Sequence, residues 1–166
     1  MYLLGYDIGS SSIKVALINI DTGKTIGTAQ SPIVEMSIIA NQIGWAEQNP
    51  EVWWDNLCQA TRMLFTKYRI DAKLIQGIGI AYQMHGLVMV DASGAVLRPA
   101  IIWCDSRAIE IGNNAFANIG EEKCLAHHLN SPGNFTASKL KCFMNSPEEF
   151  FLKYIEEIED EEIKKD

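Results

Sequence analysis

The chain has 166 residues, of which 48% are hydrophobic and 21% are charged, and this balance predicts a globular domain with a sizeable core. Its formal net charge of −7 argues against a protein that binds nucleic acid or an anionic membrane surface, because like charges repel. No targeting segment is recognisable before the first predicted strand, and no apolar run approaches the length of a membrane span. We therefore expect a cytoplasmic protein.

The first part of the chain predicts a three-stranded meander. A short apolar run at residues 3–8 predicts a strand, and the Gly-Ser-Ser-Ser sequence at residues 9–12 predicts a polar turn. Alternating apolar residues at 13–20 predict a second, half-buried strand. Turn residues at 21–23 then lead into a third, more polar strand at residues 24–34.

An amphipathic helix is predicted next. Pro50 stands where a first helical residue tolerates a missing N–H, and Asn49 is a suitable N-cap. Apolar residues recur at three- and four-residue spacings up to Arg69, which predicts one face packed on a sheet. The later elements expected are strands at residues 74–82, 87–90 and 95–97 and helices at residues 106–118, 120–129 and 137–144.

This succession of strands and helices predicts one α/β domain over residues 1–146. The remaining residues, 147–166, are strongly acidic and carry only a partial apolar stripe. We expect them to form a tail that is a solvated, fraying helix and not a second core.

The turn after the first strand carries the residue types that phosphate and metal handling require. Asp7 ends the strand, and its carboxylate could hold Mg²⁺ or the waters of the ion, since hard cations prefer oxygen ligands. Gly9 allows close backbone approach, and Ser10 and Ser11 supply hydroxyl donors. Lys14 could reach a phosphate from the second strand. On spacing alone, the alternative is an ordinary Gly-Ser hairpin turn.

A second cluster, Gln83, Met84 and His85, follows the predicted strand at residues 74–82. Binding sites in α/β sheets gather at the carboxyl ends of strands, so we expect this cluster to share one cleft with Asp7. The alternative is that His85 is a structural residue whose hydrogen bonds are satisfied within the fold.

A third cluster surrounds Trp103 and Asp105. A tryptophan face can pack against the C–H surface of a sugar, while Asp105 and Arg107 can hydrogen-bond to the sugar hydroxyls. The alternative from the residues alone is a helix start, with Asp105 as the N-cap and Trp103 in the core.

Five segments of the sequence, in this order, resemble the FGGY family of carbohydrate kinases. Any one of them is weak, but five in register over residues 3–140 are highly specific. They are DIGSSSIK at residues 7–14, GWAEQNP at 44–50, YQMHGLV at 82–88, LRPAIIWCDSR at 97–107 and NFTASKL at 134–140. The resemblance implies an α/β, ribonuclease H-like (actin-like ATPase) fold with a mixed sheet flanked by helices, of which this chain is an incomplete N-terminal domain.

The resemblance also implies an activity, the transfer of the γ-phosphoryl group of ATP, with Mg²⁺, to a sugar hydroxyl. It implies that Asp7 is the metal-linked acid. The Met84-His85 pair is similar to xylulokinases rather than to glycerol kinases, so the implied substrate is a ketopentose such as xylulose. The implied phosphate-binding residues are Gly9, Ser10, Ser11 and Lys14, and the implied sugar-binding residues are Gln83, Met84, His85, Trp103 and Asp105.

Two departures from the family pattern bear on activity. Cys104 stands where the family commonly has Asn or Gln beside the tryptophan, which alters a hydrogen bond near the pocket. The family's general base is an aspartate further downstream than Asp166, as is the adenosine-binding second domain, so we expect this chain alone to be inactive. The alternative function is a non-catalytic sugar-binding or assembly module, with an exposed sheet edge through which copies of the chain associate.

Overall fold

The computed structural model describes residues 1–128 and 130–145. The chain forms two compact units. The first comprises Met1–Ile39 and Gln48–Met84, and the second comprises Ala40–Glu47 and the described residues from His85 onward. The acidic tail expected at 147–166 lies outside the described residues. Within those residues, no helix has both the length and the apolar character needed to cross a membrane.

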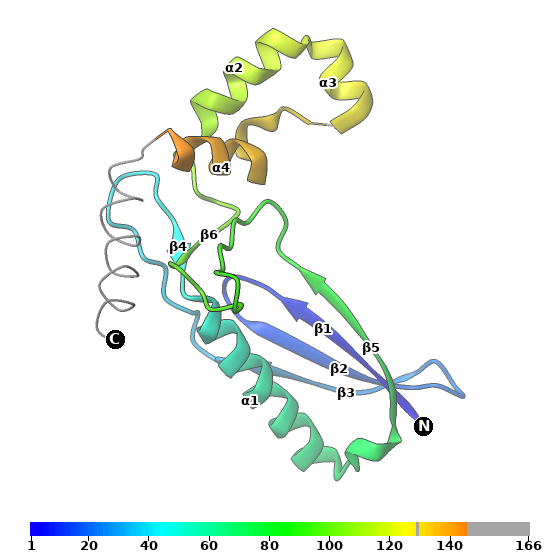
Figure 1. Cartoon of the computed structure of the whole chain (residues 1–166). Helices are drawn as coiled ribbons and strands as arrows, with labels where there is room; N and C mark the ends of the chain where they lie inside the picture. The colour runs from blue at the N-terminus through cyan, green and yellow to red at the C-terminus, as the bar shows by residue number, and fades with distance from the viewer. Residues whose placement is uncertain (129, 146–166) are drawn as a thin grey trace. The chain divides into compact units, whose positions relative to one another are not determined.

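A mixed four-stranded sheet forms the first unit, in the order β3-β2-β1-β5. The strands are β1 (Tyr2–Ile8), β2 (Ile13–Asn19), β3 (Thr25–Ser31) and β5 (Ile75–Tyr82). Strands β1, β2 and β3 pair antiparallel, and β5 pairs parallel with β1. In Figure 1, β1 lies between β2 and β5. The predicted meander is confirmed, and β3 ends at Ser31 because the proline that follows has no N–H to donate.

Helix α1 (Pro50–Tyr68) connects the meander to β5 by way of a 3₁₀ turn, η1 (Ala72–Leu74). The predicted N-cap is confirmed, since the Asn49 side chain accepts a hydrogen bond of 3.0 Å from the backbone N–H of Glu51. The helix ends at Tyr68, and its C-cap residue, Arg69, adopts a left-handed conformation with φ 51°. One turn then brings the chain back to the sheet.

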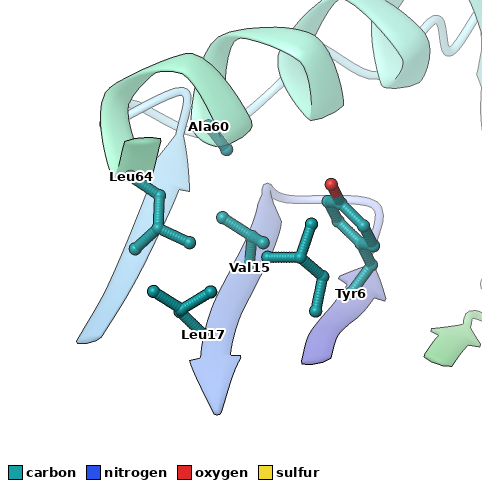
Figure 2. Close-up of a cluster of buried hydrophobic side chains, with 6 residues drawn as sticks. Tyr6, Val15, Leu17, Ala60 and Leu64 are labelled. Atoms are coloured by element: carbon teal, nitrogen blue, oxygen red, sulfur yellow. The ribbon is translucent and has the colours of Figure 1, made fainter. Parts of the chain in front are cut away.

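The core of the first unit lies between the sheet and α1 (Figure 2). Ala60 and Leu64 on the helix are fully buried, as the three- and four-residue spacing predicts. The helix packs so closely that a Cβ at Gly27 would lie 2.1 Å from the ring of Tyr68. A larger residue at position 27 would require the Tyr68 ring to move. The sheet contributes Leu4, Tyr6, Val15 and Leu17 to this core.

The second unit contains three helices and the short strand β6, joined by irregular segments. Strand β6 (Ala100–Ile101) pairs with the two-residue strand β4 (Glu47–Gln48). The helices are α2 (Ile109–Ile119), α3 (Glu121–His128) and α4 (Thr136–Met144), and a 3₁₀ turn, η2 (Pro132–Asn134), precedes α4. A Cβ at Gly112 on α2 would lie 2.3 Å from the Cα atom of Gly133, so this contact also requires glycine.

The structure differs from the predicted elements at three places in this unit. The strands expected at 87–90 and 95–97 are reduced to isolated bridges, Leu87 with Ile101 and Val90 with Val96. The short strand at Glu47 was not predicted, because two residues carry no periodic pattern. Helix α2 begins three residues later than expected. The Asp105 carboxylate accepts from the backbone N–H of Arg107 over 3.0 Å, but the helix starts only after Ala108, where no side chain caps it.

Candidate functional site

The turn between β1 and β2 in the first unit is the predicted phosphate-binding segment. The backbone N–H of Gly9 donates to the carbonyl of Ser12 over 3.3 Å, which closes the turn. A Cβ at Gly9 would lie 3.1 Å from that carbonyl oxygen, a contact tighter than side chains normally make. Glycine at this position is therefore favoured by the tightness of the turn itself.

Asp7 and Lys14 occupy paired positions on β1 and β2 and flank this turn. The Lys14 Nζ atom lies 3.5 Å from the Asp7 carboxylate, and the two side chains are 58% and 55% exposed. Such an exposed pair contributes at most about 1 kcal/mol to stability, so either group can exchange its partner for a ligand. A carboxylate and an ammonium at one turn suit a cation and a phosphate, respectively.

Asp7 also fits the kind of site that Mg²⁺ uses with phosphate ligands. Among the described residues, no group of three or more His, Cys, Asp or Glu side chains could enclose a metal ion. Mg²⁺ usually keeps several waters and is held by one or two carboxylates together with substrate phosphates. A single exposed carboxylate beside the predicted phosphate-binding turn meets that requirement.

Gln48 anchors the turn and was not recognised as a site residue from the sequence. Its Nε2 atom donates to the carbonyl of Ser10 over 2.7 Å, and its Oε1 atom accepts from the Trp53 indole over 3.0 Å. The carbonyl of Ser11 accepts from the backbone N–H of Met36 over 2.9 Å. The signal was present in the sequence, because Gln48 belongs to one of the five family-like segments.

Gln83 continues from β5 and stays beside the end of β1. Its backbone N–H donates to the carbonyl of Ile8 over 3.1 Å, and Ala81 is the register partner of Asp7. The side-chain amide of Gln83 is buried and has no hydrogen-bond partner among the described residues. Met84, the next residue, is 66% exposed. The first unit thus brings the predicted phosphate-binding residues and the first two predicted sugar-binding residues to one end of β1 and β5.

His85 begins the second unit in an unusual backbone conformation. Its φ angle is +63°, in the left-handed region that non-glycine residues rarely adopt. The imidazole stacks on the ring of Phe135, with 4.7 Å between ring centroids and 20° between ring planes. The next residue, Gly86, accepts a hydrogen bond of 3.1 Å from the Thr136 hydroxyl. This half-buried position is compatible with both roles that the sequence offers for His85, a structural residue and a sugar-binding residue.

Trp103 and Asp105 differ in their exposure, although they are two residues apart. Trp103 is 49% exposed, whereas Asp105 is fully buried. The Asp105 carboxylate accepts from the backbone N–H of Ala46 over 2.6 Å and from the Arg107 guanidinium over 2.7 and 2.9 Å. These contacts favour a role for Asp105 in holding the segment that carries Trp103 over direct contact with a substrate.

Arg107 is the centre of a buried ionic network that includes Asp105. Its guanidinium also bonds Glu47 over 2.6 Å and stacks on the Trp45 ring at 3.8 Å, and Arg98 pairs with the same Glu47 carboxylate. Burial lowers the pKa of Arg107, but the hydrogen bonds that it donates to the two carboxylates, together with their charges, outweigh burial, and the net direction is upward. This network fixes the segment on either side of Trp103.

Asp7, Gln83 and Met84 therefore belong to one unit, and His85, Trp103 and Asp105 belong to the other. The predicted common cleft of Asp7 with His85 stays a prediction.

Comparison with known proteins identifies the family. The model of the "FGGY family of carbohydrate kinases, N-terminal domain" matches residues 2–156. The xylulose kinase of Escherichia coli K12 is 34% identical over 151 residues, which are 91% of this chain and 30% of that protein. The xylulose kinase of Klebsiella pneumoniae is 35% identical over 140 residues, which are 84% of this chain and 27% of that protein.

Comparison of the fold with solved structures also finds sugar kinases. A crystal structure described as a xyloylose kinase from Brucella ovis is 31% identical with a TM-score of 0.77, over 91% of this chain and 30% of that one. The chain spans about 30% of the length of these relatives. Its fold is the ribonuclease H-like, actin-like ATPase fold, with a mixed sheet and helices. This chain belongs to the FGGY family of carbohydrate kinases and corresponds to the family's N-terminal domain.

Proposed function

We propose that this chain supplies the phosphate-binding turn and part of the sugar-binding surface of an ATP-dependent kinase that phosphorylates a ketopentose such as xylulose. The observation that carries the proposal is the exposed pair of Asp7 and Lys14 beside the glycine-dependent turn at Gly9. Family membership supports a sugar kinase, and the similarity to xylulose kinases at 34 and 35% identity supports the choice of sugar.

Phosphoryl transfer requires mainly the positioning of the γ-phosphate and the neutralisation of its charge. In this proposal the phosphates lie against the backbone of the turn at Gly9, and the hydroxyls of Ser10 and Ser11 and the Lys14 ammonium orient them. Asp7 holds Mg²⁺ directly or through water, and the bound ion supplies charge neutralisation at the phosphate oxygens. The proton of the sugar hydroxyl goes to a general base that family resemblance assigns to a later segment.

On the sugar side, the proposal assigns contacts to Gln83, Met84, His85 and Trp103, with Asp105 positioning the last of these. The amide of Gln83, which lacks a partner among the described residues, can donate to and accept from a sugar hydroxyl. The exposed face of Trp103 can cover the C–H surface of a sugar. Met84 cannot form the charge-assisted hydrogen bonds that favour a small triol, so xylulose is preferred to glycerol.

The experiment is a two-dimensional NMR titration of the 166-residue chain. Mg²⁺ with pyrophosphate should shift the amide resonances of residues 9–12, and D-xylulose should shift those of Gln83, Met84 and His85. Glycerol at the same concentration serves as the matched control ligand. Equal or larger shifts with glycerol contradict the ketopentose assignment, and a pyrophosphate response that is absent from the 9–12 turn contradicts the phosphate assignment.

A second candidate function, an assembly module, rests on one further observation. Among the described residues, β5 pairs only with β1, so its other edge is open. Ile78, Ile80 and Tyr82 on this strand are 62%, 59% and 73% exposed. An apolar open edge can pair with another copy of the chain.

A further inference from the structure

Lys139 is the largest of the fully buried side chains among the described residues. It lies on α4 (Thr136–Met144), in the second unit. Lysine is almost never fully buried unless its ammonium is paired, because moving the charge out of water is unfavourable. The position of Lys139 therefore requires a specific partner.

The partners of Lys139 are backbone carbonyls of two loops. Its Nζ atom donates to the carbonyl of His85 over 2.8 Å and to that of Asn134 over 3.0 Å. Burial lowers the pKa of Lys139, and the nearby carboxylate of Asp105 acts in the opposite direction. A hydrogen bond from a charged donor is about twice as strong as one between neutral groups, so Lys139 ties the His85 carbonyl firmly to α4.

His85 needs such a tie, because its φ angle of +63° is unfavourable for a residue with a Cβ atom. Residues in this conformation persist where the surrounding structure determines them, and they gather at ligand-binding sites. Two further contacts come from the same part of the chain. The Phe135 ring stacks on the imidazole at 4.7 Å, and the Thr136 hydroxyl bonds the carbonyl of Gly86 at 3.1 Å.

The residue that follows this loop is also held in place. Leu87 exchanges two backbone hydrogen bonds with Ile101, of 2.8 and 3.0 Å. Helix α4 is itself anchored, since the Ser138 hydroxyl donates to the carbonyl of Pro132 over 2.7 Å. The loop at His85 and Gly86 is therefore held by contacts with α4 and by the pairing of the next residue, Leu87, with β6.

We propose that Lys139 is a positioning residue which, with Phe135 and Thr136, holds His85 in its left-handed conformation so that the imidazole is oriented for a sugar hydroxyl. The assignment of His85 to the sugar rests on the proposed function, whereas the contacts of Lys139 do not. Lys139 touches no substrate in this proposal and acts only through the backbone of His85.

The test reads His85 directly by two-dimensional NMR of the imidazole C–H groups in the 166-residue chain. Stacking on Phe135 shifts these resonances upfield, and a His85→Gln variant assigns them among the three histidines. Lys139→Met keeps the length of the side chain and removes its charge and its donors. The matched control is Lys141→Met, which changes an exposed lysine on the same helix.

We expect Lys139→Met to move the His85 resonances toward their random-coil positions, and Lys141→Met to leave them in place. Unmoved His85 resonances in a folded Lys139→Met chain overturn the proposal. If Lys139→Met loses the dispersed resonances of the second unit, Thr136→Val decides, because Thr136 is exposed and its hydroxyl bonds Gly86. A shift of the His85 resonances in Thr136→Val then supports the proposal, and unchanged resonances overturn it.

Titration with D-xylulose separates this inference from the proposed function. Weakening of xylulose binding on the order of fivefold in Lys139→Met, with none in Lys141→Met, supports the positioning role. Equal xylulose affinity in folded Lys139→Met and wild type overturns that role and leaves the proposed function standing. If wild type itself does not respond to xylulose, the proposed function fails, and the His85 resonances alone decide whether Lys139 holds the loop.

Discussion

The Lys14 ammonium lies 3.5 Å from the Asp7 carboxylate, across the two strands that meet at the Gly9 turn. Both side chains are more than half exposed, so water screens their attraction. The pair is therefore better placed to meet ligand charges than to stabilise the fold.

The Asp7→Asn substitution should separate binding from stability. We expect the free energy of unfolding to change by no more than about 0.5 kcal/mol, the usual range for surface substitutions away from special features. The response of the 9–12 turn to Mg²⁺ and pyrophosphate should be lost, because the carboxylate ligand is gone. Urea unfolding and the NMR titration measure the two effects. Asp21→Asn, in the exposed turn after β2, is the control and should retain the response.

The buried network around Arg107 should behave in the opposite way. In the wild type, the carboxylates of Asp105 and Glu47 share the guanidinium of Arg107, and Arg107→Met removes it. Removing one partner of a buried ion pair typically costs about 3–5 kcal/mol. Urea unfolding should show a loss of this size, compared with little change for the exposed control Arg62→Met. A loss below about 1 kcal/mol would show that the network contributes little to the fold.

Much of the first unit could be predicted from the sequence, because its signals are local. Asn49 and Pro50 mark the start of α1, and alternating apolar residues mark β2. The two-residue strand at Glu47 could not be predicted, since two residues have no period and the pairing depends on a distant segment. The prediction of a strand at 87–90 was wrong for the same reason, because its extent depends on pairing with other segments of the chain.

In the candidate site too, features set by neighbouring residues could be predicted, and features set by distant residues could not. Asp7, Gly9 and Lys14 are residue types that phosphate and metal sites use, and their place around one turn is a local feature of the sequence. The full burial of Asp105 does not follow from its neighbours, because its partners Ala46 and Arg107 come from two segments. Lys139 gave no signal beyond its place in a family-like segment, because lysine in a helix normally faces solvent.

Stability should depend on pH through Lys139. Burial lowers the pKa of its ammonium in the folded chain, so the unfolded chain binds the proton more tightly. Stability therefore rises with pH between the folded pKa and the ordinary lysine pKa of about 10.4. Urea unfolding at pH 7 and pH 10 should show wild type gaining stability relative to Lys139→Met. Both chains contain Cys142, whose pKa is raised by burial, so its opposite effect cancels in this difference. A difference that is constant with pH contradicts the prediction.

The open edge of β5 should promote self-association of the isolated chain. Ile80 is 59% exposed on this strand, and Ile80→Glu places a charge where another strand would pack. Light scattering after size-exclusion chromatography should show wild type as a concentration-dependent oligomer and Ile80→Glu as a monomer. Ile33→Glu, which changes an 88% exposed residue outside the sheet, is the control and should oligomerise like wild type. A monomeric wild type counts against the assembly module.

The 166-residue chain alone should not phosphorylate a pentose at a useful rate. Family resemblance assigns the general base to a segment beyond those matched in this sequence, and general-base catalysis contributes about a hundred- to ten-thousand-fold. Without the second domain that the family uses for adenosine, ATP is not held in line with the sugar, and positioning is worth roughly 7 to 11 kcal/mol. The measurement is a coupled ADP-release assay with Mg·ATP and D-xylulose. An Asp7→Ala chain purified in parallel reveals any contaminating kinase, which would be equally active in both samples. Sugar-dependent turnover of about one per second, within the ordinary range for enzymes and abolished by Asp7→Ala, would show that this chain already contains its base.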